Sequence, residues 1–88
     1  MDDLCISSLV VQAQPALLNE VRDAIENFAE AEVMVQNEQG KLVVVLDTRD
    51  NRQAADTITA IQNTAGVLSA TLIYQYDNRF EPQLEDSE

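Results

Sequence analysis

Few side chains in this sequence have the chemistry that catalysis or metal binding requires. The 88 residues include one cysteine, Cys5, and no histidine. A Ser-His-Asp triad, a Cys-His dyad and a zinc site of histidines and cysteines are therefore excluded. A disulfide framework, a four-cysteine iron–sulfur cluster and a Cys-x-x-Cys metal carrier are excluded for the same reason. We expect Cys5 to be a small buried hydrophobic residue, and we expect no enzyme activity, no cofactor and no metal.

The carboxylates are numerous, but their arrangement does not predict a metal site. The chain has 16 Asp and Glu against 5 Lys and Arg, a formal net charge of −11. Glu30 and Glu32 flank a predicted turn and could share a cation, yet a hard cation needs more oxygen ligands than this segment supplies. The net charge repels phosphate backbones, which argues against nucleic-acid binding, and it attracts basic partners.

The N-terminal residues favour a cytoplasmic location. Met1-Asp2-Asp3 carries no positive side chain, and the apolar run that follows ends at Gln12, so the pattern of a secretory signal is missing. No stretch approaches the ~18 apolar residues of a membrane span. We therefore expect no direct insertion into a membrane.

Apolar periodicity predicts four strands and two helices. Strands are indicated at 4–12, in a hairpin at 32–47, and at 67–76, where β-branched residues cluster or polar and apolar residues alternate. Helices are indicated at 15–29 and 51–64 by one apolar stripe each. The order β-α-β-β-α-β predicts an α+β, ferredoxin-like domain, with two helices on one face of a four-stranded antiparallel sheet.

Smaller signals refine this prediction. The unbroken apolar run 42–46 is typical of a central strand. Gly40 in the hairpin turn and Gly66 after the second helix are expected to take positive φ, and Asp50 has the position of an N-cap, three residues before Gln53. We place one domain at 1–76. The segment 77–88, with five acids, one arginine and one proline, is predicted to be a solvated, disordered tail.

Alternation along each strand predicts which side chains the helices cover. On the helix side we place Cys5, Ser7, Leu9, Val11, Leu42, Val44, Leu46, Leu68, Ala70, Leu72 and Tyr74. On the uncovered side, called the open face below, we place Ile6, Ser8, Val10, Glu32, Met34, Gln36, Lys41, Val43, Val45, Asp47, Val67, Ser69, Thr71, Ile73 and Gln75. An exposed apolar patch of this kind marks an interaction site, unless a dimer partner or the tail covers it. The pair Ser7-Ser8 either packs as small residues or bonds to a bound peptide.

Two segments of the chain resemble the NapD family. They are Ile6 to Ala13, ISSLVVQA, and Thr64 to Tyr74, TAGVLSATLIY, and the resemblance covers about residues 4–76. It implies a cytoplasmic chaperone without catalytic residues or cofactor. Such a chaperone binds the twin-arginine (Tat) signal peptide of the periplasmic nitrate reductase subunit NapA, and delays export until the molybdenum cofactor and iron–sulfur cluster are installed.

The resemblance and the open face together suggest where the peptide binds. We expect it to lie across the sheet, in contact with Ile6, Ser8, Val10, Val43, Val45, Thr71 and Ile73. Glu32 and Asp47 are the candidate partners of its arginines. An alternative mode adds the peptide as a strand to the edge strand at 32–37. A different class of function, a dimeric ferredoxin-like regulatory domain that binds a small ligand, would need a glycine-rich ligand loop, and the turn at 37–40 has one glycine.

Overall fold

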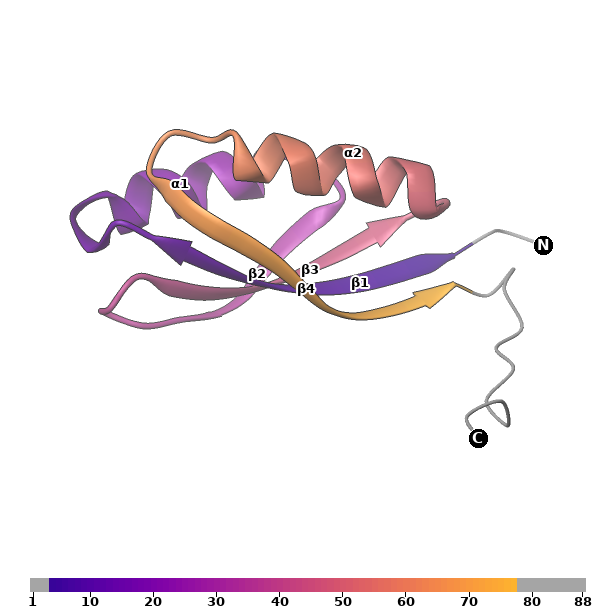
Figure 1. The fold of residues 1–88 in the computed structure, drawn as a ribbon, viewed down its shortest axis with the longest axis horizontal. Coiled ribbons are helices and arrows are strands. Elements are labelled where there is room, and N and C mark those ends of the chain that lie inside the picture. Colours follow the sequence, from indigo (N-terminus) through magenta and orange to yellow (C-terminus); the bar gives the residue numbers. More distant parts are fainter. Residues whose placement is uncertain (1–3, 78–88) are drawn as a thin grey trace.

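The computed structural model describes residues 4–77 and confirms the predicted ferredoxin-like fold. Figure 1 shows two helices lying over one side of a single twisted sheet. The elements are β1 (Cys5–Ala13), a 3-10 turn (Pro15–Leu17), α1 (Leu18–Glu26), β2 (Ala31–Gln36), β3 (Lys41–Thr48), α2 (Asn51–Gln62) and β4 (Val67–Asp77). The helix predicted at 15–29 is therefore shorter: Pro15 begins a 3-10 turn, and the α-helix ends at Glu26.

The strand order in the sheet is β2-β3-β1-β4, and all neighbouring strands are antiparallel. The order places β1 and β3 in the centre, which confirms the prediction of a central strand from the apolar run 42–46. The two edge strands are β2 and β4. Each of them is therefore paired on one side only among the described residues.

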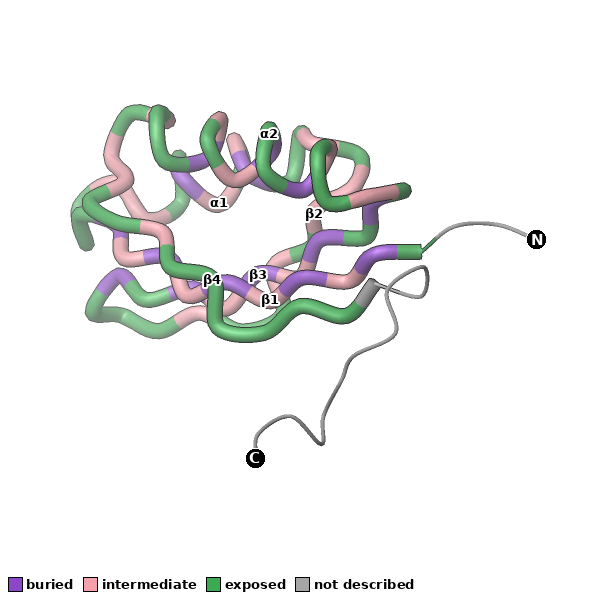
Figure 2. Tube along the Cα trace, turned by 45° about the vertical axis from the view of Figure 1, so that its right-hand side comes forward, coloured by how far each residue is buried: buried purple, intermediate pink, exposed green. Residues whose placement is uncertain are grey.

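The core lies between the helices and the two central strands. Leu9 and Val11 of β1 and Leu42, Val44 and Leu46 of β3 are fully buried. They pack with Val21 and Ile25 of α1 and Ile61 of α2, and Figure 2 shows buried segments on the helices and on the strands beneath them. The predicted faces of β1 and β3 are thus confirmed, and Cys5 is buried on the helix side as expected.

The predicted positive φ of two glycines and the predicted N-cap are also confirmed. Gly40 and Gly66 both have a φ of 94°. Asp50 caps α2, because its Oδ1 accepts a hydrogen bond of 2.8 Å from the Gln53 amide. The Gln53 side chain reaches back to the amide of Arg49 rather than to that of Asp50, so the capping box is displaced by one residue.

Two β-bulges in β4 change the faces that simple alternation predicts. Leu68 and Ile73 are the extra residues, between the pairs Ala13–Val67 and Gln12–Ser69 and between Leu9–Leu72 and Ser8–Tyr74. Each extra residue reverses the alternation that follows it. The prediction is therefore wrong for these four residues of β4: Val67 packs against the core, Leu68 is exposed, Tyr74 pairs with Ser8 on the open face, and Gln75 lies on the helix side.

A third bulge lies in β2, where Met34 is the extra residue between Val33–Val44 and Val35–Val43. Met34 is exposed, and the register assigns it no face, whereas Val35 lies on the open face opposite Val43. Gln36 was expected on the open face. The register instead pairs it with buried Leu42, on the helix side.

The proposed tail begins at Asp77, which the structure assigns to the end of β4. Residues 78–88 lie outside the described part of the chain, as do residues 1–3. Within residues 4–77, no helix is long and apolar enough to cross a membrane.

Candidate functional site

The open face of the sheet is made of four rows of side chains that cross the strands. The first row is Asp47–Ile6–Tyr76, and the second is Glu32–Val45–Ser8–Tyr74. The third is Val35–Val43–Val10–Thr71, and the fourth is Lys41–Gln12–Ser69. Acidic side chains thus stand at one corner, apolar ones fill the middle, and a lysine and small polar groups stand at the opposite end.

Six of the seven residues predicted to contact a ligand have open-face positions in the strand register. Ile6, Ser8, Val10, Val43 and Val45 belong to the central strands and are half-buried. Thr71 and Ile73 belong to β4 and are exposed. Ile73 is the extra residue of a bulge between Leu72 and Tyr74, so the register assigns it no partner and no face. The face is therefore continuous from β2 to β4.

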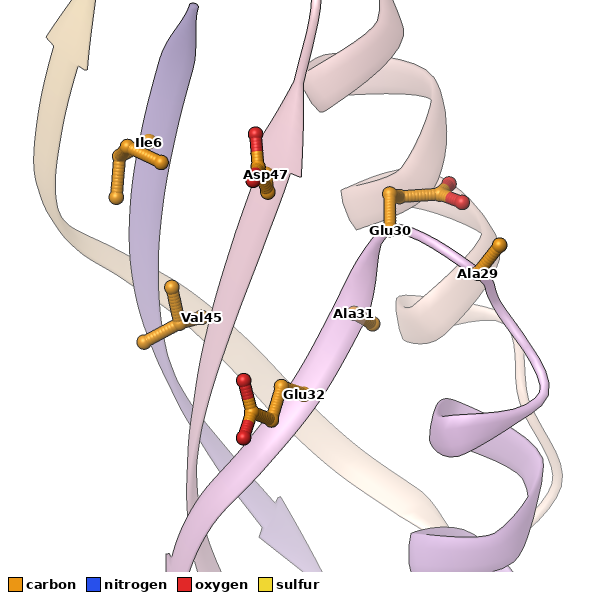
Figure 3. A pocket seen from close by; sticks show the side chains of 7 residues that line it. All are labelled: Ile6, Ala29, Glu30, Ala31, Glu32, Val45 and Asp47. Atoms are coloured by element: carbon orange, nitrogen blue, oxygen red, sulfur yellow. The ribbon is translucent and has the colours of Figure 1, made fainter.

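A pocket of about 400 Å³ opens at the acidic corner. Its walls come from the starts of β1 and β2 and the end of β3, as Figure 3 shows. Its lining residues are Ile6, Ala29, Glu30, Ala31, Glu32, Val45 and Asp47. The aliphatic side chains of Ile6 and Val45 and the two predicted arginine partners, Glu32 and Asp47, thus line one pocket.

The three carboxylates of this pocket have different surroundings. Glu30 turns toward α2, where its Oε2 accepts a hydrogen bond of 2.5 Å from Thr57 Oγ1. The carboxylates of Glu32 and Asp47 are exposed and take part in no side-chain hydrogen bond or ion pair among residues 4–77. Glu30 therefore joins β2 to the helix layer, whereas Glu32 and Asp47 keep their acceptor oxygens available to a ligand.

Two possible nucleophiles, Cys5 and Ser7, have hydrogen-bond partners inside the fold. Cys5 is buried and its Sγ donates to Asn51 Oδ1 at 3.3 Å. Ser7 is buried too, and its Oγ accepts from Gln75 Nε2 at 3.1 Å. Ser7 therefore has an internal partner, and Ser8 is the serine that faces the open side. Within the described residues, no group of three or more acids and cysteines has metal-site geometry.

The structure adds apolar residues that alternation did not assign to this face. Tyr74 and Tyr76 of β4 and Val35 of β2 are exposed there, beside the predicted residues. Their positions on the open face were not predicted, because a bulge cannot be located from alternation alone. The apolar run Leu72-Ile73-Tyr74 was no signal of a bulge either, because the longer apolar run 42–46 pairs with β1 without one.

Comparisons with known proteins agree with one another. The family described as NapD protein matches residues 4–79. The protein "Chaperone NapD" of Escherichia coli K12 is 33% identical over 70 residues, which is 78% of this chain and 80% of that one. The same figures hold for "Chaperone NapD" of Shigella flexneri. The solution structure of the E. coli Tat proofreading chaperone NapD superposes with a TM-score of 0.77 and 31% identity, covering 91% of this chain and 82% of that one.

Proposed function

This chain belongs to the NapD family, and from that premise we propose that it is a cytoplasmic chaperone for the Tat signal peptide of a NapA-type nitrate reductase. Binding of the signal peptide would delay export until cofactor insertion is complete. The observation that carries the proposal is the acid-lined pocket at the corner of an apolar open face. A Tat signal peptide has the matching chemistry, since two arginines are followed by an apolar stretch.

The layout of the open face suggests how the two parts of the peptide are received. The arginines bind at Asp47 in the first row and at Glu32 in the second. Both carboxylates lack internal side-chain partners among the described residues. The apolar stretch then lies over the side chains of Val45, Val43 and Val10 in the middle rows. The negative field of the chain favours the encounter with a cationic segment.

Typical interaction free energies indicate that the apolar contacts supply most of the binding affinity. Micromolar binding needs about 8 kcal/mol. An exposed ion pair contributes about 0–1 kcal/mol, so two such pairs supply a minor share. Each aliphatic side chain that becomes fully buried contributes about 1.5–3 kcal/mol. The carboxylates therefore select and orient the peptide, and the valines and isoleucines hold it.

The proposal is tested by calorimetric titration with a synthetic Tat signal peptide from the nitrate reductase of the same organism. We expect saturable binding, and weaker binding of a control peptide in which both arginines are glutamine. Absence of both heat and NMR shift changes at high peptide concentration would contradict the signal-peptide function.

A second prediction concerns the two free carboxylates. Glu32→Gln and Asp47→Asn should each weaken peptide binding by up to about fivefold, the range expected of an exposed ion pair. The exposed α2 residue Asp56 offers a control, Asp56→Asn, which removes the same charge away from the open face. In titrations with the glutamine peptide, the three variants should bind alike, because the arginines that couple to Glu32 and Asp47 are absent. Equal losses with both peptides would show that these carboxylates do not pair with the arginines.

A further inference from the structure

Strand β4 exposes apolar side chains on both of its faces. Of the eight large apolar residues that are exposed in the described part of the chain, five lie on it: Leu68, Leu72, Ile73, Tyr74 and Tyr76. Leu72 pairs with the buried Leu9 on the helix side and is nevertheless 43% exposed. Residues 71–76 are all exposed, and Figure 2 shows the second half of β4 as an exposed segment along the side of the sheet.

The outer edge of β4 also lacks most features that protect an edge strand. Between Val67 and Tyr76 there is neither a charged residue nor a proline, and these ten residues extend over about 34 Å. Monomeric proteins usually protect an edge with charges, prolines, bulges or a short strand. The other edge strand, β2, has six residues and carries Glu32. Of these features β4 has its two bulges and, at its last residue, the charge of Asp77.

We propose that β4 is a self-association edge, along which a second copy of this chain pairs in the antiparallel direction. Such pairing is two-fold symmetric, so one strand, uncharged from Val67 to Tyr76, supplies both halves of the interface. A chain with net charge −11 repels its own copies, and β4 is a long stretch where two copies can meet without like charges in contact. A cationic peptide is instead drawn to the acidic corner on β2 and β3.

The charge of the residues that follow β4 in the sequence fits this arrangement. Strand β4 ends at Asp77, and residues 78–88, which follow it in the sequence, carry four more acids. In an antiparallel pair of β4 strands, the two C-terminal ends of β4 lie at opposite ends of the interface. A parallel pair would bring both acidic segments together, so charge selects the antiparallel direction.

The dimer is expected to be weak and to leave the open faces free. A stable interface buries about 800 Å² on each partner, and one strand edge supplies less than that. Pairing through β4 makes a continuous eight-stranded sheet, in which the central valines of both open faces remain uncovered. The inference is therefore independent of the peptide-binding function.

Sedimentation equilibrium of the full chain over about 10 µM to 1 mM tests the proposal. We expect a reversible monomer–dimer equilibrium, and at least a tenfold weaker dimer for Leu72→Glu, because the carboxylates of two copies would lie near the two-fold axis. Met34→Glu is the matched control, since Met34 is 55% exposed on the opposite edge strand, and it should change the dimer constant by less than about twofold. Leu72 faces the helix side, so Leu72→Glu should bind the signal peptide as the unmodified chain does.

Amide hydrogen exchange then locates the interface. At high concentration, amides of β4 that point away from β1 should gain protection, and those of β2 should not. A chain that is monomeric at 1 mM would overturn the proposal. So would a dimer that Met34→Glu disrupts and Leu72→Glu leaves intact, because that result would place the contact on β2 or the adjoining open face.

Discussion

Replacing Val45 by lysine is expected to weaken binding of the Tat signal peptide by about tenfold to a hundredfold without unfolding the domain. Val45 lies in the second row of the open face, directly opposite Glu32, and lines the acidic pocket. The change removes an apolar contact of about 1.5–3 kcal/mol, and each 1.4 kcal/mol is a factor of ten in affinity. The lysine ammonium would also lie beside Glu32 and Asp47, where it competes with the arginines of the peptide.

The domain should tolerate this change, because Val45 is only half-buried and points away from the core. A lysine there can lay its methylene chain along the sheet and keep its charge in water. Thr59→Lys provides the control, since Thr59 is exposed on α2 and the substitution changes the net charge equally. Calorimetry should show near-normal affinity for Thr59→Lys. If Val45→Lys remains folded by circular dichroism and binds the peptide normally, the open face does not receive the peptide.

The fold was predictable because its strongest signals are periodic. The helical stripes that include Val21, Ile25 and Ile61 were sufficient to place both helices over the sheet, and all three are buried. Strands β1 and β3 alternate without interruption, because their mutual register has no bulge. Their assignment to faces was therefore correct for residues 5–11 and 41–47.

The edge strands were predicted less well, for a geometric reason. Alternation assigns faces only while each residue has one partner, and the bulges at Leu68, Ile73 and Met34 break that condition. After Ile73, the expected faces of Tyr74 and Gln75 are reversed. A central strand is held on both sides and a bulge there disturbs two ladders, whereas an edge strand has one ladder, which is why bulges concentrate at edges.

The two acidic residues of the candidate site were predicted from the sequence, but the pocket that they line was not. Glu32 and Asp47 are 15 positions apart in the sequence, and alternation correctly placed both on the open face. Their assembly with Ile6 into one pocket depends on the register of three strands and on the turn from α1 into β2 at Ala29 and Glu30. Sequence periodicity carries no information on that turn, so the pocket itself could only be found in the structure.

Adding a single methyl group at Gly40, in the hairpin turn, should lower the free energy of unfolding strongly. Gly40 has a φ of 94°, and a Cβ added there would lie 2.2 Å from the carbonyl oxygen of Ala13. That backbone is held by the bond from the Ala13 amide to Gly40 O, at 2.7 Å, and by Gln12 Nε2, which donates to Gln39 O at 2.9 Å. Gly40→Ala must therefore separate the hairpin from the end of β1.

We expect Gly40→Ala to lower the free energy of unfolding by about 3 kcal/mol. The left-handed conformation of an alanine costs about 1–2 kcal/mol, and the lost hydrogen bonds cost about 0.5–1.5 kcal/mol each. Gly66→Ala is the matched comparison, since Gly66 has the same φ, but its added Cβ would meet the side chains of Val21 and Leu17 rather than backbone. Side chains can shift, so its cost should stay near 2 kcal/mol.

Urea denaturation of both variants measures the difference, with equal slopes expected because the same surface unfolds. A Gly40→Ala variant as stable as Gly66→Ala would show that the hairpin can move away from Ala13 at little cost. In that case the contact between the hairpin and β1 would not be rigid. The fourth row of the open face, where Lys41 stands beside Gln12, would then not be fixed in position relative to the acidic corner.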